Sequence, residues 1–312
     1  MLQFVIKRFG QSIVLILIVT IITFFLMNLA PGGPSSMMRL DATEEERQAI
    51  AEQLGLNDPV VVRYGSWLVS AFQGDLGLSL SSGEPVMDRL MERVPYTMQL
   101  AGWTIVISVI VGIVLGIISA KKRNKWQDHT INFGSVIGLS VPSFWLAIMF
   151  ILLFSVQLGW LPSSGVGGTG LMDQFLSSLM PVIILSTATL PTIVRFTRSS
   201  MLEVISQDFI RTSRAKGLKE RVVIYQHALR NALIPVISII GVLIPRLLSG
   251  AVIVESVFGW PGIGRLIVEA AQARDYNLVM GVTVVVTIVV VISNFIVDII
   301  YSKVDPRVKN VG

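Results

Sequence analysis

Ionisable side chains inside long apolar stretches are the residues of this chain most able to do chemistry. Arg246, Glu255 and Asp298 lie in such stretches. A charge at the centre of a bilayer costs about 2.5–3.5 kcal/mol on insertion scales, so each should face protein or water. Arg246 lies mid-stretch beside Pro245, where it could line a translocation path and attract a carboxylate of a transported solute. The alternative is a structural arginine, held by an internal ion pair or by backbone carbonyl groups, that fixes its helix in place.

Two of these residues lie near the ends of their stretches. A structural role is expected for Glu255 and Asp298, although Glu255 joins Arg246 and Pro245 as a candidate path residue. An ion-coupled carrier is expected to place several acids at mid-membrane. Their scarcity here argues against an ion-coupled carrier and indicates that any energy source lies outside this chain.

Enzyme chemistry has little support in the sequence. The chain has no cysteine and only two histidines, His129 and His227, which excludes thiolate metal sites and imidazole clusters. No phosphate-binding G-x-x-x-x-G-K-[S/T] loop occurs. The glycines of Gly165–Gly170 match dinucleotide-binding spacing, but they follow no strand and open no helix, so we interpret the match as chance. We expect no catalytic residue, no metal site and no cofactor bound by this chain.

The composition is that of an integral membrane protein. Hydrophobic residues make up 53% of the 312 residues and charged residues 14%, against roughly 25% charged in soluble proteins. Six segments reach the roughly 20 apolar residues needed to cross a bilayer. They are approximately Phe9–Ala30, Thr97–Ala120, Ile131–Val156, Phe175–Phe196, Ala232–Val257 and Leu278–Tyr301.

The lysines and arginines predict the orientation. Most lie on one side if both termini are cytoplasmic, as the positive-inside rule requires. The net charge of +5 therefore reflects topology, and no nucleic-acid partner is expected. We predict a multi-pass protein of a bacterial or archaeal cytoplasmic membrane.

The outer segment between the first two spans should contain short helices. A capping box at Thr43–Glu46 and a closing Gly55 predict one helix, and a second is predicted at Val60–Phe72 with Pro59 at its start. The amphipathic stretch Val86–Arg93 is expected to lie along the membrane surface before the second span. This segment could seat a soluble extracytoplasmic partner, or it could simply cover the helix bundle.

Prolines and glycines occur within the fourth and fifth predicted spans. Broken transmembrane helices are tolerated where the freed backbone groups are buried in protein or line a wet cavity. We therefore expect these two spans to be interrupted and to line the translocation path. The residues concerned are Pro181, Pro191, Pro235, Pro245, Gly241 and Gly250.

The basic segment Arg211–Pro235 lies on the predicted cytoplasmic side. Gly217 stands where a helix would stop, with Arg214 and Lys216 in the turn before it, favourably placed against the negative end of the helix dipole. A second helical stretch is predicted from Lys219 to Ala228. Such a helix–glycine–helix could be a handle by which a soluble protein moves membrane helices, or an ordinary charged loop.

Residues 211–217 and 227–235 resemble the coupling-loop motif of permease subunits in the oligopeptide/dipeptide/nickel branch of ABC importers. The similarity is to the first of that branch's two permeases, and it runs nearly end to end. The other matching segments are Ala30–Pro34, Leu54–Pro59, Gly74–Ser79, Val141–Trp145, Gly159–Pro162, Val254–Gly264, Arg274–Tyr276 and Val304–Arg307.

The sequence departs from the general motif at a few positions. The general importer motif begins Glu-Ala-Ala, where this chain has Arg211, Thr212 and Ser213, and Gly33 stands where many relatives carry Asp. The interval from Gly217 to Pro235 is also longer than in the general form.

The resemblance implies an all-α fold, the six-helix type I ABC importer permease, with cytoplasmic termini. It implies a heterodimer with a second, homologous permease, two ATPase subunits that bind ATP and Mg, and an extracytoplasmic solute-binding protein. Ser206–Lys216 would form the coupling helix, with Gly217 as its break. The implied ATPase-coupling residues are Asp208, Arg211, Thr212, Arg214, Ala215, Lys216 and Gly217.

The resulting hypothesis is a permease subunit of an ATP-driven importer of di- and oligopeptides, with no enzymatic activity of its own. One alternative is the same machine with another cargo: glutathione, a nickel chelate, an opine or an oligosaccharide. The other is a stand-alone channel or ion-coupled carrier. The predicted organisation is an N-terminal transmembrane helix (1–30), an extracytoplasmic loop region with short helices (31–95), a five-helix core (96–302) that includes the coupling loop 197–231, and a cytoplasmic tail (303–312).

Overall fold

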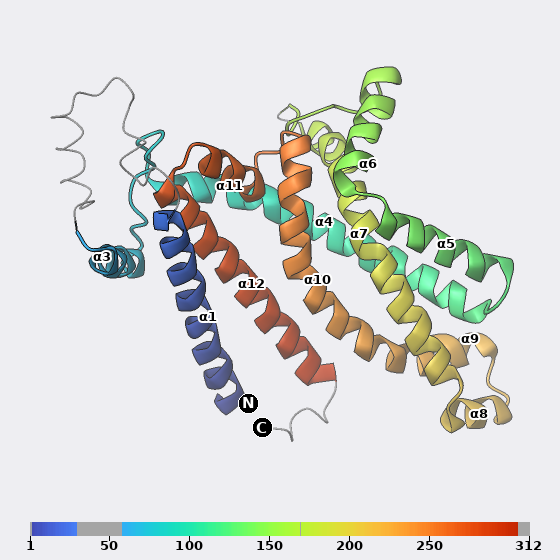
Figure 1. Cartoon of the computed structure of the whole chain (residues 1–312). Coiled ribbons are helices and arrows are strands. Elements are labelled where there is room, and N and C mark those ends of the chain that lie inside the picture. The colour runs from blue at the N-terminus through green and yellow to red at the C-terminus, as the bar shows by residue number, and fades with distance from the viewer. Residues whose placement is uncertain (1, 30–57, 169, 305–312) are drawn as a thin grey trace. The chain divides into compact units, whose positions relative to one another are not determined.

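The computed structural model describes residues 2–29, 58–168 and 170–304, and these residues fold almost entirely into helices (Figure 1). Their bounds are α1 (Leu2–Leu29), α3 (Val60–Phe72), α4 (Val86–Lys121), α5 (Trp126–Ser140), α6 (Ser143–Phe150), η2 (Ile151–Gln157), α7 (Leu171–Ile205), α8 (Asp208–Ala215), α9 (Glu220–Val222), η3 (Val223–Ala228), α10 (Leu229–Val257), α11 (Ile263–Gln272) and α12 (Tyr276–Val304). The described part of the chain contains a single isolated β-bridge, Leu78 to Pro85.

Among the described residues, five helical segments are long and apolar enough to cross a membrane, and they confirm five of the six predicted spans. They are Arg8–Leu29, Val86–Lys121, Leu171–Ile205, Glu220–Leu248 and Tyr276–Val297. The third predicted span differs, because α5 and the α6–η2 helix meet at a bend of 99°. Only if this bent pair counts as one span does the number reach six.

Pro142 explains the bend. A proline disfavours the α conformation for the residue before it, and Val141 is extended with φ −82° and ψ 125°. Pro142 itself is extended, with ψ 131°, and acts as the N-cap of α6. Two successive extended residues cannot continue a helix, so the predicted straight span becomes two arms.

The prolines of the fourth and fifth spans behave differently, and the predicted interruptions there are wrong. α7 continues through Pro181 and Pro191, and α10 continues through Pro235 and Pro245. The ribbon of α10 nevertheless changes direction along its length (Figure 1). A proline removes one backbone donor, and a helix packed among neighbours can satisfy the freed carbonyl group and stay continuous.

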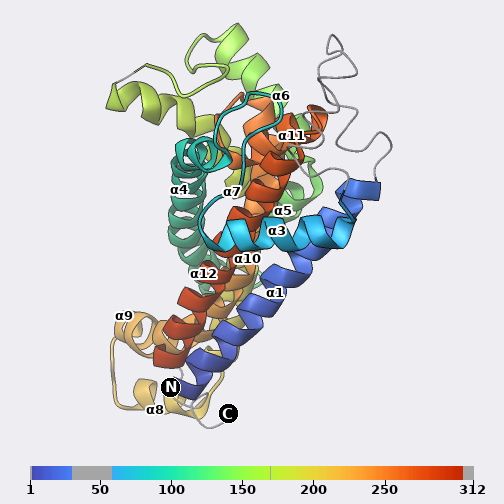
Figure 2. The same ribbon diagram turned by 90° about the vertical axis from the view of Figure 1, so that its left-hand side faces the viewer.

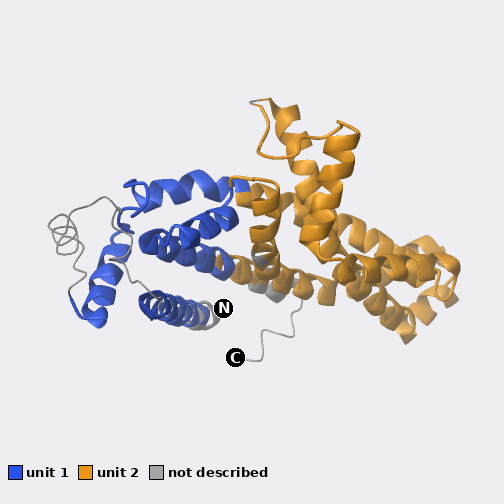
Figure 3. Ribbon diagram, turned by 45° about the horizontal axis from the view of Figure 1, so that its top comes forward, with its two compact units in different colours: residues 1–96, 262–291 blue, residues 97–261, 292–312 orange. Residues whose placement is uncertain are grey.

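The helices divide into two compact units, residues 1–96 with 262–291 and residues 97–261 with 292–312 (Figure 3). In the first unit, α3 begins directly after Pro59, as predicted. It runs across α1 (Figure 2), where the hydroxyl groups of Tyr64 and Thr20 are hydrogen-bonded at 3.0 Å. The helix predicted between Thr43 and Gly55 lies outside the described residues.

The start of α4 belongs to the core of the first unit. Val86 and Leu90 are fully buried and pack in one cluster with Leu266 of α11 and Leu278 of α12. The predicted amphipathic stretch Val86–Arg93 forms the first turns of the 36-residue helix α4, and its position along the membrane surface stays a prediction. Its apolar stripe, with period i, i+4, faces protein rather than lipid.

In the second unit, glycines let α4 and α5 approach α7 closely. A Cβ atom at Gly116 of α4 would lie 2.5 Å from Cβ of Thr197, and one at Gly138 of α5 would lie 3.1 Å from the carbonyl oxygen of Thr187. Small residues at helix contacts are a common means of tight packing within membranes. These contacts make α7 the central helix of the second unit.

Candidate functional site

The short helix α8 follows the end of α7, and most of its residues are exposed. Gln207 is extended with ψ 155° and serves as its N-cap, Asp208 lies in the first turn and Arg214 in the last, so both charges complement the helix dipole. In both views α8 and α9 lie at the end of their unit (Figures 1 and 2). Ser206, which the resemblance placed at the start of this helix, ends α7 instead.

Gly217 ends this helix in the way that the sequence predicts. Its φ of +75° is left-handed, which L side chains rarely adopt. The Gly217 amide donates to the carbonyl oxygen of Arg214 at 2.9 Å, and the Leu218 amide donates to that of Ser213 at 3.4 Å. This pair of bonds is the Schellman motif, in which a glycine closes the helix and turns the chain. A Cβ atom at Gly217 would meet nothing within 4 Å, so backbone conformation alone favours glycine.

All seven predicted coupling residues are exposed and lie on this helix and turn. Within α8 only Ile210 is buried, and it is fully so. Ile210 belongs to a hydrophobic cluster drawn from four other helical segments: Ile117 and Ala120 of α4, Met201 and Val204 of α7, Val223, Ile224 and Ala228 of η3, and Ala232 of α10. A force applied to α8 would therefore reach the ends of three long helices through one side chain.

The charges of the turn are arranged in pairs. Arg214 Nε and Nη2 donate to the two carboxylate oxygens of Glu220 at 3.2 and 2.9 Å, which closes the bend across Gly217. This pairing raises the pKa of Arg214, chiefly through the hydrogen bond from its guanidinium group to Glu220. Arg211 lies 3.6 Å from Asp208, and both are largely exposed, so this contact is weak.

Three apolar side chains on the surface of this region are absent from the sequence-based site. Phe209, Leu218 and Tyr225 are exposed by 39%, 40% and 46%. Phe209 precedes Ile210, and successive residues of a helix point in directions about 100° apart, so only one of the two can face the core. That pattern of two adjacent apolar residues in a short polar helix was a signal that one of the two is exposed.

The candidate path residues on α10 differ in how far they are buried. Arg246 is exposed on α10, Pro245 is partly buried, and Glu255 is fully buried. The Glu255 carboxylate accepts a hydrogen bond of 2.6 Å from the Thr97 hydroxyl of α4. The role of all three in a translocation path stays a prediction. Asp298 lies on α12.

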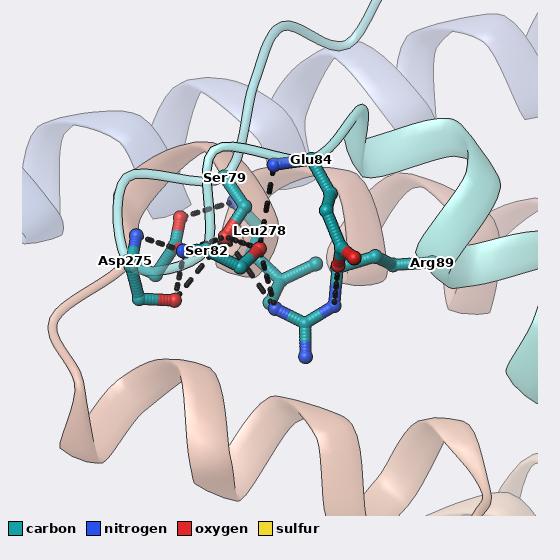
Figure 4. Close-up of polar contacts among 7 residues, drawn as sticks. Ser79, Ser82, Glu84, Arg89, Asp275 and Leu278 are labelled. Carbon is teal, nitrogen blue, oxygen red and sulfur yellow. Dashed lines mark hydrogen bonds and ion pairs between the residues drawn. The ribbon is translucent and has the colours of Figure 1, made fainter.

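A second polar cluster surrounds Asp275 in the first unit (Figure 4). Its carboxylate is buried and accepts hydrogen bonds from the Ser79 hydroxyl, from the Ser81 amide and hydroxyl at 3.1 and 2.8 Å, and from the Leu278 amide at 3.1 Å. Burial alone would raise the pKa of Asp275, but these donors together lower it below its ordinary value. Arg89 lies at the edge of the cluster, 3.7 Å from Glu84.

This cluster joins two segments that the sequence resemblance noted separately, Gly74–Ser79 and Arg274–Tyr276. Gly77 also lies close to Asn277, since a Cβ atom at Gly77 would lie 3.2 Å from the side-chain amide nitrogen of Asn277. Within the described ranges, no group of three His, Asp or Glu residues could hold a metal ion. The hydrogen bonds to Asp275 fix the loop before α4 onto the start of α12.

Comparison with known protein families decides what kind of protein this is. The family described as "Binding-protein-dependent transport system inner membrane component" matches residues 112–310, and its N-terminal counterpart matches residues 1–101. The chain belongs to this family. It is a multi-pass component of the inner membrane, and the helices that could span a membrane agree with that assignment.

Curated relatives match this family member along its whole length. The oligopeptide transport system permease protein AppB of Bacillus subtilis is 41% identical over 99% of this chain and 100% of its own length. The dipeptide transport system permease protein DppB of Alkalihalophilus pseudofirmus is 39% identical over 99% of this chain and 100% of its own length.

A solved structure shows the fold of this family member. The MetNI methionine ABC transporter in an inward-facing conformation aligns with a TM-score of 0.57 and 20% identity, covering 70% of this chain and 97% of that chain. The type I ABC importer permease fold expected from the sequence is thereby confirmed. In this family the chain serves as the membrane subunit of a transporter, and ATP hydrolysis belongs to a separate subunit.

Proposed function

We propose that this chain is one of two permease subunits through which an ATP-driven importer moves di- and oligopeptides across the cytoplasmic membrane. Full-length relatives that are named as oligopeptide and dipeptide permeases support this cargo. The second permease is a homologous chain, two ATPases bind ATP and Mg on the cytoplasmic side, and an extracytoplasmic binding protein delivers the peptide.

The observation that carries the mechanism is the exposed helix α8 with its single buried anchor. A partner ATPase would bind the exposed residues between Asp208 and Gly217. A displacement of α8 would then be transmitted through the packing of Ile210 to α4, α7 and α10. ATP binding would then favour one opening of the helix bundle over the other, because the contacts at α8 differ between the two states. The chain acts as a gate, and the ATPases supply the energy.

Arg246 is the residue that we propose for the path. It is exposed on α10 within the segment Glu220–Leu248 that could span a membrane, where a charge is costly in lipid and suited to a wet cavity. There its guanidinium group would pair with the C-terminal carboxylate of a peptide. Pro245 and Glu255 would shape α10 around it.

Reconstitution into vesicles tests this function. The complete complex, loaded with binding protein, is expected to take up labelled di- and tripeptides only when ATP is supplied, with glutathione, a nickel chelate, an opine and an oligosaccharide as competing cargoes. Uptake of one of these in place of peptides would contradict the assignment of peptides as the cargo. Conduction of solute by the purified chain alone would contradict the assignment of the chain to an ATP-driven importer.

A further inference from the structure

A partly buried ion pair in the second unit has no role in the proposed coupling surface. Asp128 lies in the first turn of α5, and its side chain is only 3% exposed. Arg198 of α7 binds it with both branches of the guanidinium group, Nε to Oδ1 at 2.7 Å and Nη2 to Oδ2 at 2.8 Å. This two-point geometry fixes the relative orientation of two helices better than a single contact would.

The remaining acceptor positions of the same carboxylate reach two further segments. The Ser119 hydroxyl at the end of α4 donates to Oδ1, and the Asn124 amide of the intervening turn donates to Oδ2 at 2.9 Å. Asn124 has a left-handed φ of 61°, which an asparagine tolerates better than most residues. Asn132 adds a bond of 2.7 Å within α5. Asp128 therefore ties together α4, the turn, α5 and α7.

The position of Arg198 connects this tie to α8. Met201 and Val204, on the next turns of α7, pack in the cluster that buries Ile210. On the other side, Gly138 lets α5 contact α7 again at Thr187 and Pro191. α5 is thus fixed to α7 at two points, one near each of its ends, and the bend at Pro142 follows the second point directly.

We propose that Asp128 and Arg198 form a clamp that makes α5 follow α7 when α8 is displaced, so that motion from the ATPase reaches the bend at Pro142. Asp128 and Arg198 are positioning residues in this proposal, since they act through the helices that they join. The proposal rests on the proposed function, because the ATPase supplies the displacement.

The test uses the whole complex in vesicles and measures peptide uptake per ATP hydrolysed. The double variant Asp128→Asn/Arg198→Met removes the clamp without leaving an unpaired buried charge, which neutralising one partner alone would do. Arg198→Lys keeps the charge but loses the two-point fork. The matched control, Arg265→Met/Glu269→Gln, removes the partly exposed pair of α11, whose Nε to Oε1 distance is also 2.7 Å.

The double variant is expected to assemble and to hydrolyse ATP, but its uptake per ATP should fall at least about fivefold, the lower end of typical coupling between sites. Uptake per ATP should also fall in Arg198→Lys, and in the control it should equal that of wild type. Wild-type uptake per ATP in both clamp variants would overturn the proposal and show that the pair only stabilises the fold. Failure of the wild-type complex to couple ATP to uptake would instead overturn the proposed function.

Discussion

The hydroxyl group of Ser79 donates a hydrogen bond to the carboxylate of Asp275, although 196 residues separate them in the chain. This bond and the two from Ser81 hold the loop before α4 against the start of α12. Each donor favours the ionised carboxylate, and a buried carboxylate that loses a donor keeps the cost of its desolvation. The contact makes the geometry of that loop depend on the charge state of one side chain.

We expect Asp275→Asn to lower the stability of the folded protein by about 2 kcal/mol at neutral pH, the scale of hydrogen bonds to a charged group. Because the folded-state pKa of Asp275 is lowered, its contribution is present above the ordinary carboxyl pKa and is lost as the pH falls through the folded value. The gap in melting temperature between wild type and variant should therefore stay constant from pH 7 to about 5 and close below about pH 4.

Thermal unfolding of detergent-solubilised protein measures this gap. Asp88→Asn is the matched control, since Asp88 is an exposed acid on the first turns of α4. A gap that is equally large at pH 3 and pH 7 would show that the ionised carboxylate is not the stabilising form.

Gly217→Pro should abolish coupled uptake while leaving membrane insertion intact. Proline fixes φ near −65° and has no amide to donate to Arg214, so the turn cannot form. Gly217→Asn is the matched variant, because asparagine tolerates the left-handed region. We expect at least about a tenfold difference in ATP-dependent uptake between the two, which corresponds to about 1.4 kcal/mol. Equal uptake by the two variants would mean that the bend is not needed.

Reversing the charge of Arg214 separates a structural role from a docking role. The pair with Glu220 is half exposed, and exposed pairs contribute at most about 1 kcal/mol. Arg214→Glu should therefore fold but lose ATPase binding. The swapped double variant Arg214→Glu/Glu220→Arg should also fail to bind the ATPase subunits, which co-purification measures. If the double variant regained ATPase binding, the role of Arg214 would be to stabilise the turn rather than to contact the ATPase.

Phe209→Ala should weaken ATPase docking with little effect on the fold. Exposed aromatic side chains often dominate binding energy at interfaces, and truncation of such an anchor costs about 2 kcal/mol or more. We expect at least about a tenfold rise in the dissociation constant for the ATPase subunits. Phe133→Ala, at an exposed phenylalanine of α5, is the matched control. An unchanged affinity would place Phe209 outside the interface.

Arg246→Gln should change the preference among cargoes. If the guanidinium group pairs with a peptide carboxylate, wild type should transport free-acid dipeptides faster than their C-terminal amides, and the variant should lose that preference by about fivefold or more. Arg195→Gln, at an exposed arginine of α7, should keep it. Identical preferences in wild type and Arg246→Gln would leave Arg246 with a structural role.

Local signals in the sequence predicted the elements that depend on local conformation. Pro59 marks the start of α3, and Gly217 marks the end of α8, because each residue restricts or frees the backbone where it stands. The length of the apolar runs predicted five spans. The exposure of the coupling residues followed from the charge of the segment.

The features that the sequence did not predict depend on packing between residues that are distant in the chain. Whether a proline breaks a span depends on its neighbours: Pro142 bends the third span, while α7 and α10 continue through theirs. The partners of Asp128 and Asp275 lie 70 and 196 residues away, and no spacing rule relates such distant positions. Ile210 and Phe209 are both apolar, and only the tertiary structure shows which one is buried.

The bend at Pro142 also constrains how the protein is made. α5 has 15 residues and is about 22 Å long, short of the roughly 30 Å of hydrocarbon, and the α6–η2 arm is no longer. Neither arm can leave the translocon as an independent span. We therefore expect stable integration of this region to wait until the ribosome has delivered α7, the helix against which Gly138 packs.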